Sequence, residues 1–216
     1  MKNILFVLLF FVAIKTYGTA QAADIIIFNG KEYFLFTNPL EKYFEEHPDK
    51  RPKRGNFLTA LMRGYIATFE FKDNELILKD IEIYISDSLR ENEPESEWVS
   101  VLDEVFPNQE VLKIDWWTGL LVLPFGEVIN CATMGYGSTY ENYILIEINS
   151  GNLIKSLEMN YIEYEIFKEK QFEEFKKTDK YKEIFEKLKK YDYPNEEIDD
   201  FIKLFESDYL TKILTE

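Results

Sequence analysis

Residues 61–86, LMRGYIATFEFKDNELILKDIEIYIS, decide the fold, because apolar and polar residues alternate along them on both sides of Asp73-Asn74. Alternation over such a length is typical of half-buried β-strands. An Asp-Asn pair suits a two-residue turn in which both residues have positive φ. The stretch therefore predicts two antiparallel strands joined at Asp73-Asn74.

The apolar residues change parity part-way along the second strand. Leu76 and Leu78 share one parity, whereas Ile81 and Ile83 share the other. Because side chains alternate between the two faces of a strand, this change would move the apolar set from the core to solvent. One extra residue at positions 79–80, a β-bulge, restores the phase. The expected register pairs Phe71 with Leu76, Phe69 with Leu78, Ala67 with Ile81 and Tyr65 with Ile83.

The remaining patterns predict an α+β fold. Strands are expected at residues 24–28, 31–36, 111–117, 120–123, 143–148 and 153–157, and short helices at residues 38–47 and 98–106. Residues 124–126, Pro-Phe-Gly, predict a turn. From Asn160 the apolar period changes to about 3.6 residues, and Asn160 with Glu163 has the spacing of a helix capping box. We expect an antiparallel twisted sheet built from hairpins, with a C-terminal helical segment packed on it.

The N-terminus has the features of an export signal. Lys2 precedes an apolar run at residues 4–14, and Ala20-Gln21-Ala22 is a small-residue cleavage site. The run is shorter than the roughly 20 residues that a membrane span needs. We expect a signal peptide over residues 1–22 and an exported mature protein, periplasmic or extracellular, without a stable membrane anchor. The alternative is a buried N-terminal helix.

The mature chain is expected to form one domain. Residues 23–160 should be mainly antiparallel sheet with short helices, and residues 161–216 should add helices to the same domain.

The chain is strongly acidic, with a formal net charge of −15. The excess is uneven, because residues 71–130 contain 14 acidic and 4 basic side chains. Such a surface repels nucleic acid and anionic membranes. It favours a basic partner or a cation, or it serves solubility alone.

One short segment is basic, in contrast to the rest of the chain. Residues 49–55 contain four basic side chains, which could contact an anion or an acidic partner. These side chains are Lys50, Arg51, Lys53 and Arg54. The alternative is an exposed loop punctuated by Pro52 and Gly55.

A second candidate site surrounds residues 134–140, Met-Gly-Tyr-Gly-Ser-Thr-Tyr, which could line a small-ligand pocket. The candidate ligand-binding residues are Arg63, Trp116, Trp117, Cys131, Tyr136, Ser138 and Tyr140. An aromatic face such as that of a tryptophan can stack on a sugar. Adjacent tryptophans in an alternating strand point to opposite faces, so at most one of the pair is expected in the core.

Cys131 is the sole cysteine and His47 the sole histidine. No internal disulfide can form, and a structural zinc site is nearly excluded. A lone cysteine is usually a small buried hydrophobe, although an intermolecular disulfide or a nucleophile are alternatives. No familiar hydrolase motif occurs, so we assign no catalytic residue, metal or cofactor.

Two stretches resemble a recurrent pattern in a family of uncharacterised bacterial proteins. They are NPLEKYFEEHPDKRP at residues 38–52 and RGYIATFEFKDNELILKDIEI at residues 63–83. The resemblance covers roughly the first half of the mature chain. It implies a bacterial origin and no particular activity.

Export, acidity and the lack of catalytic motifs together favour a non-enzymatic binding protein. We expect an inhibitor or immunity-type protein that acts on a basic partner. The alternative is a small-ligand-binding protein or an enzyme with a pocket near residues 134–140.

Overall fold

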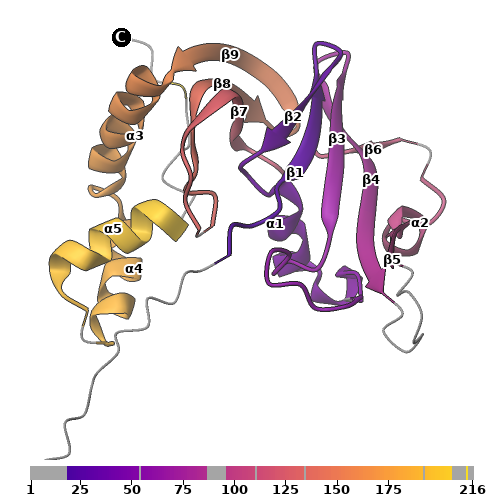
Figure 1. Cartoon of the computed structure of the whole chain (residues 1–216), viewed down its shortest axis with the longest axis horizontal. Helices are drawn as coiled ribbons and strands as arrows, with labels where there is room; N and C mark the ends of the chain where they lie inside the picture. Colours follow the sequence, from indigo (N-terminus) through magenta and orange to yellow (C-terminus); the bar gives the residue numbers. More distant parts are fainter. Residues whose placement is uncertain are drawn as a thin grey trace, which may run out of the picture.

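The computed structural model describes residues 19–53, 55–86, 96–109, 111–133, 135–191, 193–205 and 213. It has an α+β fold with a large, mostly antiparallel sheet and five α-helices in these residues (Figure 1). The strands are β1 Asp24–Phe28, β2 Lys31–Leu35, β3 Ile66–Lys72, β4 Glu75–Ser86, β5 Ser96–Ser100, β6 Leu112–Lys113, β7 Gly119–Asn130, β8 Thr139–Asn149 and β9 Asn152–Asn160. The helices are α1 Pro39–Glu46, α2 Leu102–Val105, α3 Tyr161–Phe175, α4 Asp179–Lys189 and α5 Asn195–Phe205, with a short 3-10 helix η1 at Pro48–Lys50.

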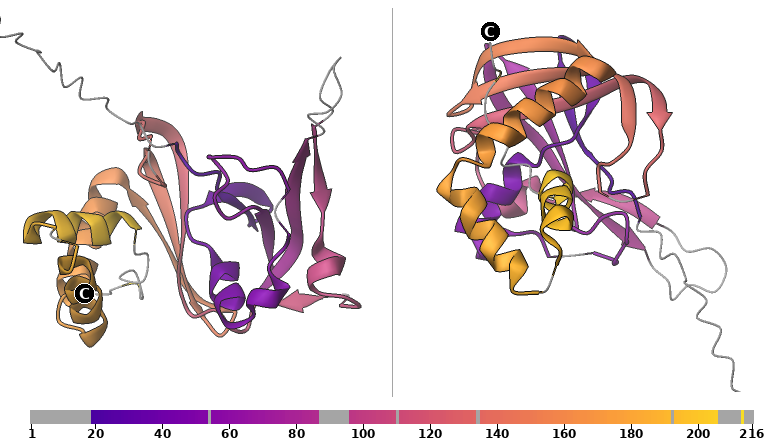
Figure 2. Two further views of the ribbon diagram at one scale, coloured as in Figure 1. Left: turned by 90° about the horizontal axis from the view of Figure 1, so that it is seen from below. Right: turned by 90° about the vertical axis from the view of Figure 1, so that its left-hand side faces the viewer.

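The sheet consists of two halves that enclose the main core. Its strand order is β2-β1-β3-β4-β9-β8-β7, and β5 and β6 also pair with β4. Strands β4 and β9 pair only between Glu75 and Asn152, so the halves meet at one end. At the opposite side, the two end strands β2 and β7 approach each other, and the Phe36 amide just after β2 donates a hydrogen bond to the Val122 carbonyl of β7 at 2.8 Å. The halves consequently face one another, with α1 between them (Figure 2).

The strand pair β3–β4 has the register that the alternation predicts. Phe71 pairs with Leu76, Phe69 with Leu78, Ala67 with Ile81 and Lys72 with Glu75. Thr68 pairs with Asp80, so Lys79 is the extra residue of the bulge. Asp73 and Asn74 have φ of 50° and 64°, as a two-residue turn requires. The bulge keeps Ile81 and Ile83 buried on the core side.

Strands β7 and β8 are buried on both faces. Leu121 and Ile146 point into the main core, whereas Leu120 and Leu145 pack against α3 on the other side. Helix α3 begins with the predicted capping box, in which Asn160 and Glu163 bond reciprocally. The C-terminal part of α3 packs with α4 and α5 in a separate cluster built on Phe172, Phe175, Ile198 and Ile202.

The prediction for residues 98–106 was wrong in part. The first three of these residues belong to β5, and only Leu102–Val105 form helix α2. Trp98 and Val99 pair with Tyr84 and Ile83 of β4. Pairing with β4 therefore outweighed the helical spacing of the apolar residues.

The chain around Trp116 and Pro124 also differs from expectation. Only Leu112–Lys113 of the predicted strand 111–117 is extended in the sheet. Strand β7 runs straight through the predicted turn, because Pro124 still pairs with Tyr143. The register shifts just after Phe125, where Gly126 has a φ of 86°. The glycine accommodates a bulge in a continuous strand rather than a turn.

In the part of the chain that the structure describes, no helix is both long and apolar enough to cross a membrane.

Candidate functional site

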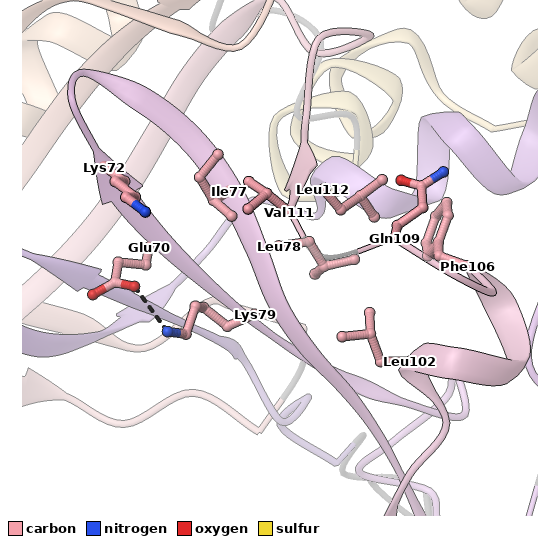
Figure 3. A pocket seen from close by; sticks show the side chains of 10 residues that line it. All are labelled: Glu70, Lys72, Ile77, Leu78, Lys79, Leu102, Phe106, Gln109, Val111 and Leu112. Atoms are coloured by element: carbon pink, nitrogen blue, oxygen red, sulfur yellow. Dashed lines mark ion pairs between the residues drawn. The ribbon is translucent and has the colours of Figure 1, made fainter.

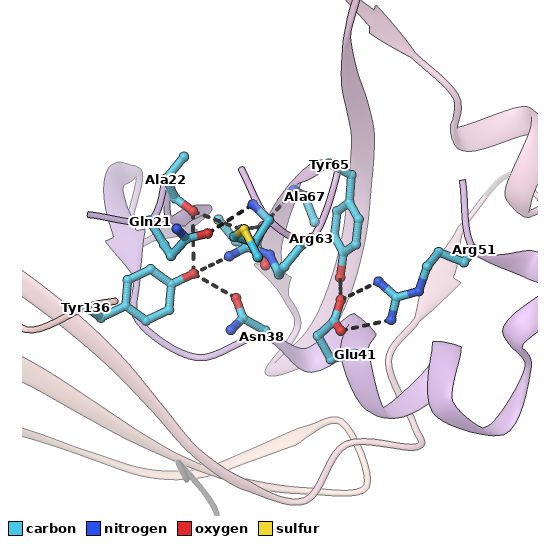
Figure 4. Close-up of polar contacts among 11 residues, drawn as sticks. Gln21, Ala22, Asn38, Glu41, Arg51, Arg63, Tyr65, Ala67 and Tyr136 are labelled. Atoms are coloured by element: carbon cyan, nitrogen blue, oxygen red, sulfur yellow. Dashed lines mark hydrogen bonds and ion pairs between the residues drawn. The ribbon is translucent and has the colours of Figure 1, made fainter. Parts of the chain in front are cut away.

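A network of buried polar side chains joins the start of β1, helix α1 and the segment before β3 (Figure 4). Asp24 is fully buried at the start of β1. Its Oδ1 accepts hydrogen bonds from Arg63 Nη2 at 3.0 Å and from the Ala67 amide at 2.9 Å. Arg63 lies in the turn that precedes β3 and is largely buried. The network therefore begins with an ion pair inside the protein.

A second ion pair extends the network to the surface. The carboxylate of Glu41, in α1, accepts a hydrogen bond from each of the two Nη atoms of Arg51, at 2.9 and 2.8 Å. It also accepts the hydroxyl of Tyr65 at 2.8 Å. The fork-shaped pairing fixes Arg51 over the ring of Phe44, 5.0 Å from its centroid.

Tyr136 brings the segment between β7 and β8 into this network. Its hydroxyl accepts a hydrogen bond from Arg63 Nη1 and donates to Asn38 Oδ1 at 2.9 Å. Its ring stacks on Phe36 with centroids 4.8 Å apart. Asn38 precedes α1 as predicted but makes no side-chain cap, because its side chain binds Tyr136 instead. Two predicted ligand-binding residues, Arg63 and Tyr136, are thus in direct contact.

Burial and hydrogen bonds together set the pKa values in this network. Burial raises the pKa of Asp24 to about 6, although Arg63 and the Ala67 amide oppose the rise. Burial also raises the pKa of Tyr136 to about 12, so its hydroxyl stays neutral at pH 7. For Glu41, the hydrogen bonds from Arg51 and Tyr65 together outweigh burial and lower the pKa. Within the described residues, Asp24 Oδ2 and Arg63 Nε are buried without a hydrogen-bond partner.

The tryptophan pair lies elsewhere, and the prediction about it was wrong. Trp116 and Trp117 are both partly buried and both pack against the main core. Residues 115–117 leave the strand in a turn, so the alternation that would separate the two side chains does not apply. Trp116 also donates from Nε1 to the Pro39 carbonyl at 3.2 Å. Both indoles therefore pack against the core, where the alternation predicted at most one.

Of the other predicted pocket residues, Tyr140 contacts Phe36, the residue on which Tyr136 stacks, whereas Ser138 bonds within its own segment. Cys131 is exposed, contrary to the expectation of a buried thiol, because it lies just beyond the end of β7. Ser138 Oγ accepts the Ala132 amide at 3.1 Å, and the ring of Tyr140 packs edge-on against Phe36. Met134 lies outside the described residues.

The four basic residues of the segment 49–55 differ in their surroundings. Arg51 is used in the pair with Glu41, whereas Lys50 and Lys53 are exposed. Arg54 lies outside the described residues. The prediction of a joint anion contact by all four side chains remains untested.

A cavity of about 330 Å³ lies beside β3 and β4 (Figure 3). Both polar and apolar side chains line it, and the polar ones include the Lys79–Glu70 ion pair at 3.0 Å. The lining residues are Glu70, Lys72, Ile77, Leu78, Lys79, Leu102, Phe106, Gln109, Val111 and Leu112. None of them belongs to residues 134–140, so this cavity is not the pocket that the sequence suggested.

Strands β4 and β5 present an acidic aromatic face on the side opposite the core, made of Asp80, Glu82, Tyr84 and Trp98. The register pairs Tyr84 with Trp98 and Glu82 with Ser100, so these side chains share one face. The rings of Tyr84 and Trp98 meet edge-on, 5.5 Å apart, and Trp98 is 45% exposed. Asp80 accepts the Ser100 hydroxyl at 2.6 Å. Sequence reasoning missed this face because it assigned Trp98 to a helix.

Comparisons of the chain with known protein families, with curated protein sequences and with solved structures gave no match.

Proposed function

We propose that the protein is exported and acts as a non-enzymatic binding protein, of inhibitor or immunity type, with a basic protein as its partner. The observation that carries the proposal is the half-exposed Trp98 beside Tyr84, Glu82 and Asp80 on the outer face of β4 and β5. Export is supported by the charged start, the apolar run and the small-residue cleavage site of the N-terminus.

The acidic aromatic face suits a partner that presents arginine or lysine. An exposed indole attracts a cation to its ring face, and a neighbouring carboxylate such as Glu82 can pair with the same cation. Tryptophan and tyrosine are also the residues that most often dominate binding at protein interfaces. The two rings already contact each other, so little side-chain freedom is lost on binding.

The net charge supports the same partner. A formal charge of −15 attracts a basic protein over distances comparable to the Debye length, about 10 Å at moderate salt. The connection between β4 and β5 adds four acidic side chains and one arginine in the sequence. Association should therefore be fast at low salt and slower at high salt.

Calorimetry with a basic lysozyme and a panel of other cationic proteins tests the proposal. We expect one of them to bind the protein, and Trp98→Ala and Glu82→Gln each to weaken that binding about tenfold or more. Matched controls are Tyr191→Ala and Glu158→Gln, which change an exposed aromatic residue and an exposed carboxylate elsewhere. Equal losses in the controls, or no binding across the panel at moderate salt, would contradict the proposal.

A small-ligand or enzymatic function near residues 134–140 is the second candidate. It is supported by Tyr136, which contacts an ion pair whose carboxylate, Asp24, has a pKa of about 6. Against it, the guanidinium of Arg63 and the hydroxyl of Tyr136 already bind protein groups. A ligand whose affinity falls with Tyr136→Phe, but not with Trp98→Ala, would favour this second candidate.

A further inference from the structure

We infer that the export segment is cut between Ala20 and Gln21, so that Gln21 and Ala22 remain as part of the folded protein. This inference rests on the proposed export. Two cuts fit the sequence. A cut after Ala20 would follow the small residues Gly18 and Ala20, and a cut after Ala22 would follow the small residues Ala20 and Ala22. Gln21 and Ala22 lie between the two cuts, and their contacts favour the cut after Ala20.

Gln21 is held by its backbone and by both ends of its amide side chain. Its backbone amide donates to the Gly135 carbonyl at 3.0 Å. Its Nε2 donates a hydrogen bond to the Thr59 carbonyl at 2.8 Å, and its Oε1 accepts one from the Met62 amide at 3.0 Å. Gln21 thereby connects the segment before β3 to the segment between β7 and β8.

Ala22 completes the buried ion pair. Its carbonyl accepts Arg63 Nη2 at 3.0 Å, the same nitrogen that binds Asp24. Its amide donates to the Ala60 carbonyl at 2.7 Å. Because Arg63 is largely buried, a guanidinium that lost this acceptor would have little access to water in exchange.

A cut after Ala22 would remove all of these bonds and add a charge. Hydrolysis would leave an ammonium on Ala23, where the peptide bond now lies close to the guanidinium of Arg63. Two positive charges would then share one carboxylate, that of Asp24. The added positive charge and the loss of the Ala22 carbonyl as an acceptor would both destabilise the folded protein.

A cut after Ala20 keeps these bonds. One water is consumed as the C–N bond between Ala20 and Gln21 breaks, which leaves a carboxylate on Ala20 and an ammonium on Gln21. The new ammonium can still donate to the Gly135 carbonyl. Among the described contacts, the cut loses the bridge between Ala20 and Gly135 and the hydrogen bond from Gln21 Nε2 to the Thr19 carbonyl at 3.3 Å.

The test is the intact mass of the full chain, produced in an exporting bacterium and recovered from the periplasm or medium. We expect the mass of residues 21–216, with the terminal glutamine either intact or cyclised. The mass of residues 23–216 would overturn the inference while leaving export in place. An uncut chain would overturn the proposed export itself.

Thermal unfolding of chains produced with defined starts gives a second readout. We expect a chain that begins at Ala23 to melt more than about 5 °C below one that begins at Gln21. A chain that begins at Thr19 is the matched control and should melt within about 2 °C of the Gln21 chain. Equal melting temperatures for the Gln21 and Ala23 chains would overturn the role assigned to Gln21 and Ala22.

Discussion

Arg63 and Tyr136 lie 73 residues apart in the sequence, yet the guanidinium of one donates a hydrogen bond to the hydroxyl of the other. The contact ties the segment between β7 and β8 to the segment that enters β3. It lies beside Asp24, so an ion pair and a neutral hydroxyl hold together three distant parts of the chain.

Loss of the Tyr136 hydroxyl should destabilise the protein. Tyr136→Phe leaves Arg63 Nη1 and Asn38 Oδ1 without this partner, and we expect the free energy of unfolding to fall by about 1–3 kcal/mol. Urea denaturation measures the change. Tyr191→Phe removes a hydroxyl from a 70% exposed ring and serves as the control. Similar losses in both variants would argue against the network.

Asp24 should make stability fall as the pH rises from 5 to 7. Its pKa is about 6 in the folded protein and 3.8 as the ordinary value, so the folded state binds more protons in this window. The contribution is complete below the ordinary pKa and is lost as the pH rises through about 6. The expected loss between pH 5 and pH 7 is about 1 kcal/mol.

Asp24→Asn should abolish this fall in stability between pH 5 and pH 7. The variant also leaves Arg63 without its counter-ion and is therefore less stable overall. Glu41 has a lowered pKa, so its contribution is present above its ordinary value and lost only as the pH falls. That contribution is common to both proteins and cancels in the comparison. Urea denaturation at pH 5, 6 and 7 provides the measurement, and parallel pH profiles would refute the assignment.

The bulge at Lys79 should be required for folding. Deleting Lys79 would turn Ile81 and Ile83 from the core to solvent, so we expect a loss above about 4 kcal/mol or no cooperative unfolding. Lys79→Ala keeps the extra residue and loses only a surface ion pair with Glu70, which costs less than about 1 kcal/mol. Circular dichroism during heating distinguishes them, and a deletion variant as stable as Lys79→Ala would contradict the role of the bulge.

Arg51 should differ from its basic neighbours in its effect on stability. Arg51→Lys cannot reproduce the two parallel bonds to Glu41, and we expect the free energy of unfolding to fall by about 1 kcal/mol. Lys53→Arg changes an exposed residue two positions away and should have no measurable effect. Denaturant titration of both variants checks the difference; equal effects would mean that the fork-shaped pair contributes nothing.

Local patterns predicted those parts of the fold that depend on neighbouring residues. The parity change between Leu78 and Ile81 located the bulge, because a strand alternates its side chains whatever surrounds it. The spacing of Asn160 and Glu163 located the start of α3 for a similar reason, since both partners lie within one helical turn.

Trp98 and the tryptophan pair show where such patterns were insufficient. The apolar residues after Trp98 have helical spacing, but Trp98 and Val99 pair with the edge of β4 and are therefore in a strand. Trp116 and Trp117 both reached the core because a turn, set by distant packing, replaced the alternating strand.

The sequence by itself determined the register of β3 and β4, the acidic charge and the helical C-terminus, because each depends on residue order or composition alone. Only the tertiary structure decided that Arg63 meets Asp24 and Tyr136, and that Gln21 and Ala22 belong to the same assembly. These partners lie on segments far apart in the sequence. Their contact depends on how the two halves of the sheet close around the core, which no local period encodes.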